Sequence, residues 1–282
     1  MVPEDHNQNE TNKQSRDNSD ADPKDNAAQP AADTSVLSDF WRAMALLSRV
    51  PLPPVGDFRP AMVARSVWCW PLVGLVLAGL ALLPAMLVET LSGSVVVFAI
   101  LAVAAMVLLT GSMHEDGIAD CADGFGGGLD RARKLEIMRD STVGTYAVVA
   151  LILCIALRLA VLVAAAEIGQ AAILFLVMAV MSRSAMPFLM RVLPPARDNG
   201  LGKGAGRPDW LPVLVGFAMA GAITLFLAGF AAMLAVVAAT ALAVLTVRTV
   251  ANWQIGGQTG DVLGATQICA ELFVGVAFVA VL

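Results

Sequence analysis

Charged residues are scarce in this sequence, at 15% of its 282 positions, whereas hydrophobic residues make up 58%. A soluble domain of this length carries far more charge, so the composition excludes an ordinary globular fold in water. Aromatic residues are also few, at 6%, and the net charge is −5. The chain therefore lacks the basic field and the stacking platforms of a nucleic-acid-binding surface, and we expect no nucleic-acid partner.

Cysteine is rare as well, and its four residues stand far apart in the sequence, at Cys69, Cys121, Cys154 and Cys269. This spacing contains no CxxC pair and does not have the density of a disulfide scaffold. We therefore expect the four thiols to be reduced and mostly structural.

The first 35 residues differ from the rest, with eight acidic residues, three basic residues and no aromatic residue. Such a segment buries too little apolar surface to offset the entropy of ordering, so we predict a disordered polar tail over 1–35. The remainder, 36–282, is predicted to be one integral membrane catalytic domain. It starts with an apolar helical stripe that ends at a PLPP segment, which predicts a helix at the membrane interface with Arg42 and Arg49 beside the stripe.

Long apolar segments fill most of the remaining sequence. Seven of them approach the roughly 20 residues that a membrane-spanning helix needs. They cover residues 67–88, 94–111, 144–166, 171–190, 211–229, 231–247 and 265–282. Only Gly229 and Phe230 separate the fifth from the sixth. The sequence thus predicts an all-α, polytopic membrane helix bundle with about seven spans.

Lysine and arginine are distributed unevenly among the connections. Seven of the 18 precede the first span, four lie between the second and third, five lie at or after the end of the fourth, and one follows the sixth. The positive-inside rule then predicts a multi-pass protein of the inner membrane whose N-terminus and polar loops are cytoplasmic. The remaining base, Arg158, falls inside the third span, where it either has a partner or snorkels from a helix end.

An acidic row follows the second span, in the segment GSMHEDGIADCADGFGGG. Asp116, Asp120 and Asp123 stand at i, i+4 and i+7, so they share one face of a helix. Two carboxylates 6 Å apart repel by roughly 3 kcal/mol at an effective dielectric of 20, which favours a bound cation. Oxygen-only ligands indicate Mg²⁺. The alternative is that these acids cap helix N-termini or pair with Arg131 and Arg133.

Polar residues near this row are further candidates. His114 is either a ligand or base, or a structural hydrogen-bonding group. Lys134 and Arg139, on the next loop, suit a diphosphate, although bases beside a membrane also bind anionic lipid. Asp140 adds a carboxylate to that loop.

Two glycine-rich loops come later in the chain. Lys203 and Arg207 lie among the glycines of the first, which suggests a flexible anion-binding lid without the Walker spacing. The second, IGGQTGDVLGA, contains Gly257 and Asp261. It is predicted to present a carboxylate beside a closely approaching backbone, with a simple helix entrance as the alternative.

Five motifs together carry a family resemblance. They are RVPLPP (49–54), WPLVGLVLAG (70–79), HxDGxADxxDG (114–124), KLEIMRDSTVGT (134–145) and GGQTGDVLGA (256–265). On these residues the chain resembles the cobalamin synthase family, the adenosylcobinamide-GDP ribazoletransferases. Two positions depart from the family pattern, namely Ser112, where a second glycine is expected, and Glu115, where an apolar residue is expected.

The resemblance implies that a ribosyl hydroxyl of α-ribazole, or of its 5′-phosphate, attacks a phosphorus of adenosylcobinamide-GDP and displaces GMP. It implies Mg²⁺ as the cofactor, since displacement at a diphosphate needs its charge neutralised. Its other implied partners are the lipid bilayer and other late enzymes of the cobalamin pathway. The implied roles are metal binding by Asp116, Asp120 and Asp123, joined by Asp261, diphosphate binding by Arg139 and Lys134, and general base catalysis by His114 or Asp140.

Three other classes share part of this pattern. A CDP-alcohol phosphotransferase of phospholipid synthesis has an arginine after the alanine of its acidic motif, whereas Asp120 follows Ala119 here. An intramembrane prenyltransferase pairs two aspartate-rich motifs on separate helices. A transporter concentrates polar groups at mid-membrane, whereas the ionisable groups here lie mostly in predicted loops.

Overall fold

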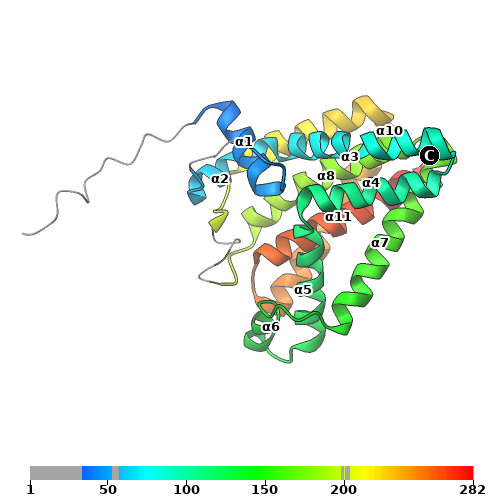
Figure 1. Cartoon of the computed structure of the whole chain (residues 1–282). Coiled ribbons are helices and arrows are strands. Elements are labelled where there is room, and N and C mark those ends of the chain that lie inside the picture. The colour runs from blue at the N-terminus through cyan, green and yellow to red at the C-terminus, as the bar shows by residue number, and fades with distance from the viewer. Residues whose placement is uncertain (1–33, 53–56, 198–199, 201–203, 282) are drawn as a thin grey trace, which may run out of the picture. The chain divides into compact units, whose positions relative to one another are not determined.

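The computed structural model describes residues 34–52, 57–197, 200 and 204–281, which form helices joined by loops (Figure 1). These residues contain one isolated β-bridge, between Pro195 and Gln258, and no strand. The all-α prediction is therefore confirmed. The predicted disordered tail lies almost wholly outside the described residues.

The first helices pack around one buried carboxylate. Ser35 caps α1 (Val36–Leu47) by accepting the Ser38 N–H, and α2 (Pro60–Ser66) continues into the short 3-10 helix η2 (Val67–Cys69). Asp39 is buried and pairs with Arg42 at 2.9 Å and with Arg65 at 3.2 Å. The predicted N-terminal helix is present, and its Arg42 is buried, donating to Asp39 Oδ1 and to Asp57 O.

Membrane-length helices form the body of the protein. They are α3 (Trp70–Ser92), α7 (Thr145–Ala166), α8 (Ala171–Val192), α10 (Trp210–Ile255) and α11 (Gly260–Val281). In the described residues, length and composition give five candidate spans, or six if α4 (Val95–Thr110) and the helix after it are counted as one bent span. In the most apolar 18-residue stretch of each helix, 83% is buried inside the protein for α8 but only 22% for α7. Helix α8 is therefore central, whereas α7 turns most of its surface to the lipid.

The 46-residue α10 contains a break at Gly229, where φ is 82° and ψ is 178°. A straight helix of that length would extend about 69 Å, roughly twice a bilayer core. Both of its ends nevertheless lie near the end of α8: the rings of Trp210 and Phe188 are 6.4 Å apart, and Gln258 N–H donates to Pro194 O at 2.8 Å. The chain therefore turns back at Gly229, at the predicted connection. Dividing α10 there yields the separate fifth and sixth segments that the sequence indicates.

Helix α5 (Met113–Gly127) turns away from α4 by 88° (Figure 1). Gly111 and Ser112 make the bend, with φ values of 66° and 59°. Because α5 is short and contains four acidic residues, we place it outside the spanning segments. It is followed by α6 (Arg131–Ile137), and the two carry the central motifs of the sequence.

Candidate active site

Two glycines allow α5 to pack directly on α11. A Cβ atom added at Gly117 would lie 2.7 Å from the carbonyl oxygen of Asp261, and one added at Gly264 would lie 3.3 Å from the Gly117 Cα. Small residues at a helix crossing let two backbones approach closely. This crossing places the acidic face of α5, with Asp116 and Asp120, beside Asp261 at the start of α11.

The close crossing predicts opposite effects for two Gly→Ala variants. Gly117→Ala is expected to destabilise the protein by about 1–3 kcal/mol, because its methyl group overlaps the α11 backbone. Gly79→Ala is the matched control, since a Cβ there meets no atom within 4 Å and alanine favours a helix. Thermal unfolding in detergent should show a lower midpoint for Gly117→Ala only. Equal midpoints would contradict the packing described.

Carboxylates crowd one another at this crossing. Burial, and then the negative charges of Asp116 and Asp261, raise the pKa of Asp120 to about 7. Arg197 supplies an opposing charge, since its Nη2 lies 3.5 Å from Asp261 Oδ2. The mutual repulsion of the three carboxylates favours a further cation beside them.

Arg197 is a site residue that sequence reasoning did not single out. Its Nη2 atom also donates to Leu135 O, at 3.2 Å, so it joins the end of α6 to α11. Its loop is held in place because Ala196 N–H donates to Gln258 O and Arg131 donates to Ala196 O. The sequence offered only a weak signal, a base shortly before a glycine-rich loop.

Asp123 has a role different from the other two aspartates of the row. Its Oδ2 accepts the Gly144 N–H at 2.6 Å, and its Oδ1 accepts the Ala147 N–H at 2.9 Å. It therefore satisfies two otherwise unpaired N–H groups at the start of α7. The structure bears out the capping alternative for this residue.

The predicted three-carboxylate row is not a ready-made metal cage. Within the described part of the chain, no three Asp, Glu, His or Cys side chains converge closely enough to enclose an ion. Asp123 is turned to the start of α7, and Asp116, Asp120 and Asp261 do not converge to that degree either. The candidate ligands are instead contributed by two helices, with Asp116 and Asp120 on α5 and Asp261 on α11.

The α6 segment contains three predicted site residues with different surroundings. Lys134 Nζ donates to Gln254 Oε1, which ties α6 to the end of α10. Arg139 is exposed, and its positive charge acts on Arg197, so it lies near the acidic cluster. Asp140 is exposed and accepts the Thr142 N–H at 3.0 Å, a bond that lowers the pKa of Asp140 and makes it a weaker base.

The later loops give a mixed result. A Cβ at Gly257 would lie 2.4 Å from Pro194 O, so close backbone packing requires a glycine there, and its predicted role in substrate binding stays a prediction. Arg207 donates to Arg191 O and lines a separate cavity with Arg65 and Trp68, away from the acidic cluster. Lys203 lies outside the described residues, so its predicted role stays a prediction.

His114 borders a cavity of about 270 Å³ that also touches Asp116 and Asp261. The side chain is 2% exposed, and its Nε2 atom has no hydrogen-bond partner among the described residues. A buried imidazole nitrogen without a partner is costly, so it is available to a ligand in the cavity.

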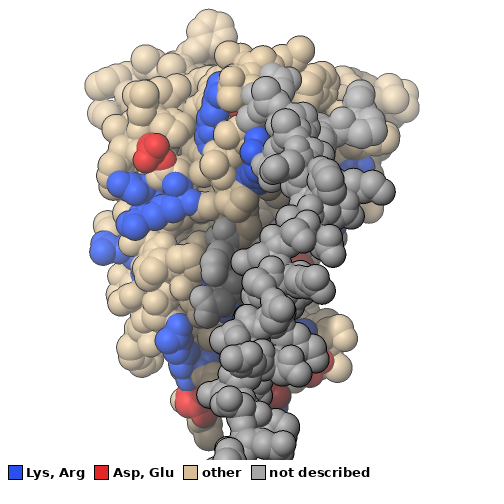
Figure 2. Space-filling model, turned by 90° about the vertical axis from the view of Figure 1, so that its left-hand side faces the viewer, with Lys and Arg blue, Asp and Glu red and all other residues tan. Residues whose placement is uncertain are grey.

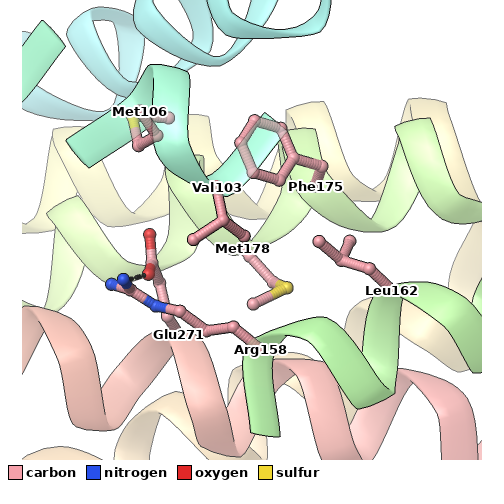
Figure 3. Close-up of a pocket in the computed structure, with 7 residues that line it drawn as sticks. All are labelled: Val103, Met106, Arg158, Leu162, Phe175, Met178 and Glu271. Atoms are coloured by element: carbon pink, nitrogen blue, oxygen red, sulfur yellow. Dashed lines mark ion pairs between the residues drawn. The ribbon is translucent and has the colours of Figure 1, made fainter. Parts of the chain in front are cut away.

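A buried ionic network joins α5 to the helix bundle, and Figure 3 shows its Arg158–Glu271 pair. Arg158 on α7 pairs with Glu115 on α5 at 2.7 Å and with Glu271 on α11 at 2.5 Å. Arg183 on α8 lies 3.8 Å from the other oxygen of Glu271. Arg158 thus has partners, and Glu115, which departs from the family pattern, supplies one of them.

Comparison with known proteins gives one consistent result. A family model described as cobalamin-5-phosphate synthase matches residues 39–279. A relative from Sinorhizobium medicae (strain WSM419) is 40% identical over 252 residues, covering 84% of this chain and 96% of the relative. One from Bradyrhizobium diazoefficiens is 40% identical over 243 residues, covering 85% and 92%. Both relatives are named adenosylcobinamide-GDP ribazoletransferase. No solved structure matches.

Proposed function

The chain belongs to the cobalamin-5-phosphate synthase family, and we propose that it is an adenosylcobinamide-GDP ribazoletransferase of cobalamin biosynthesis. A hydroxyl oxygen of α-ribazole, or of its 5′-phosphate, forms a bond to the cobinamide-linked phosphorus. The bond from that phosphorus to GMP breaks, and the hydroxyl proton passes to a base. The observation that carries this proposal is the α5–α11 crossing, which gathers carboxylates of two helices beside a cavity.

Magnesium is the metal that the donor set fits. Asp116, Asp120 and Asp261 offer only oxygen atoms, and burial followed by the negative charges of Asp116 and Asp261 raises the pKa of Asp120, so a cation beside it would be favourable. Magnesium commonly uses one or two carboxylates and completes its shell with water and substrate phosphate, so a preformed three-carboxylate cage is not required. When bound, the ion would neutralise charge on the diphosphate.

Other side chains have roles in the same displacement. Arg197, beside Asp261, and Arg139, near Arg197, are placed to bind phosphate oxygens as GMP leaves. His114, at the cavity wall, is our candidate for the base that removes the proton from the attacking hydroxyl. Asp123 holds α7 against α5 and acts as a positioning residue.

The protein is a multi-pass membrane protein, and we propose that it lies in the inner membrane with the site facing the cytoplasm. Figure 2 shows several groups of lysine and arginine side chains on one face. Most exposed arginines of the described chain lie in connections that the positive-inside rule assigns to the cytoplasm; they are Arg49, Arg59, Arg131, Arg133, Arg139 and Arg207. Enzymes that supply or consume the two substrates would work from that side.

The test is GMP release by the purified protein in lipid nanodiscs. We expect GMP only when adenosylcobinamide-GDP and α-ribazole, or its 5′-phosphate, are supplied together. A CDP-alcohol donor with an alcohol acceptor is the control reaction and should yield no CMP. CMP release without GMP release would favour the phospholipid-synthesis alternative, and no release from either pair would overturn the proposal.

A further inference from the structure

The cavity beside the acidic cluster is lined mainly by apolar side chains, although it borders a charged site. It lies between α1, α2, α3, α5, α8, α11 and the loop around Ala205. Its main apolar residues are Leu46, Leu47, Phe58, Val63, Met113 and Met186. Asp116, Asp261 and His114 form its polar part. A compact apolar ligand with one polar end fits this division.

Two buried nitrogens of residues that line this cavity have no hydrogen-bond partner among the described residues. They are Nε1 of Trp70 and Nε2 of His114, and both side chains are 2% exposed. Indole Nε1 is a donor only, so Trp70 calls for an acceptor atom. Leaving a buried donor unpaired costs free energy, which a ligand with a correctly placed acceptor would recover.

The two substrates contain three large groups, namely the corrin, guanine and the benzimidazole base, and these differ in how well they fit this cavity. A corrin macrocycle with its amide side chains is too large for a cavity of about 270 Å³, since the pockets of much smaller, drug-sized ligands already measure roughly 300–1,000 Å³. Guanine carries several donors and acceptors, which the apolar lining would leave unpaired. The benzimidazole base of α-ribazole is a small bicyclic apolar ring with one free ring nitrogen, which is an acceptor.

We propose that this cavity binds the benzimidazole base of α-ribazole, with Trp70 Nε1 donating to the ring nitrogen that is not bonded to the sugar. The inference rests on the proposed function and names the subsite of the acceptor substrate. With the base in the apolar part, the attached ribose lies toward Asp116, Asp261 and His114. This order brings the attacking hydroxyl to the carboxylates and leaves the region around Arg197 and Arg139 for the diphosphate.

The subsite is tested with Trp70→Phe, which removes the donor and keeps an aromatic side chain. The KM for α-ribazole is expected to rise about tenfold, as for one lost hydrogen bond to a buried group, while kcat and the KM for adenosylcobinamide-GDP change less than about twofold. Trp253→Phe is the matched control, because Trp253 is 80% exposed on α10, and it should leave all three constants unchanged.

A second variant and a binding measurement keep the test decisive if Trp70→Phe does not fold. Ala205→Leu adds bulk at the cavity wall and should raise the KM for α-ribazole selectively. Calorimetry with α-ribazole alone should show binding to the wild type and weaker binding to both variants. The proposed subsite would be wrong if both variants kept the wild-type KM for α-ribazole. It would also be wrong if they raised the KM for adenosylcobinamide-GDP instead. Absence of wild-type GMP release would instead overturn the proposed function.

Discussion

Replacement of Asp120 by asparagine is expected to lower GMP release at least about a hundredfold, with the protein still inserted and folded. Asparagine keeps the size of the side chain but removes the negative charge that Asp116 and Asp261 crowd. Loss of that charge weakens the attraction for a divalent cation and relieves repulsion in the free protein. The variant should therefore be at least as stable as the wild type while being nearly inactive. The measurement pairs the rate at saturating substrates with a thermal midpoint.

Asp123→Asn is the matched control for this prediction. The asparagine oxygen still accepts one of the N–H groups at Gly144 and Ala147, and asparagine caps helices about as well as aspartate. We expect it to retain most of the activity. If the two variants lost activity equally, Asp123 would be a ligand as the sequence pattern suggested; if neither lost activity, the cluster at the α5–α11 crossing would not be the reaction centre.

Replacement of Arg158 by methionine is expected to lower the free energy of unfolding by about 3–5 kcal/mol. The reason is that Glu115 and Glu271 would remain as buried carboxylates without Arg158, and Arg183 lies no closer than 3.8 Å to Glu271. Methionine preserves much of the apolar stem of arginine, so the lower free energy of unfolding would come from the missing positive charge rather than from a cavity. Reversible unfolding in mixed micelles would measure it.

A second substitution tests whether the lost stability comes from the unpaired carboxylates or from disturbed packing. In Arg158→Met combined with Glu115→Gln, one of the two unpaired carboxylates is neutralised, and roughly half of the lost stability should return. Simple addition of two destabilising effects would show that the network is not electrostatically coupled. Because the network holds α5 to α7 and α11, GMP release should recover together with stability.

The spanning helices were predictable because their signal is local: long apolar segments set their positions, and Gly229 marked the reversal inside α10. The residues around Asp123 in the sequence could not show whether it binds a metal or caps a helix. Its partners, Gly144 and Ala147, lie more than 20 residues later in the chain. A helical face groups Asp116, Asp120 and Asp123, and only packing against α7 separates the last of them.

The pairings across the bundle were beyond sequence reasoning for the same reason. Arg197 meets Asp261, and Arg158 meets Glu271, only because α11 returns beside α5 and α7. Glu115 looked like an irregularity in a motif, but its partner lies in the third predicted span. No single-sequence pattern encodes such distances, whereas the glycines at 117 and 264 mark the crossing once the helices are known.

The dependence of GMP release on magnesium is the most direct test of the carboxylate cluster as a cation-assisted diphosphate site. With both substrates present, wild-type release should fall to background in excess EDTA and return when Mg²⁺ is added beyond the chelator. Undiminished release in EDTA would show that Asp116, Asp120 and Asp261 do not act through a metal.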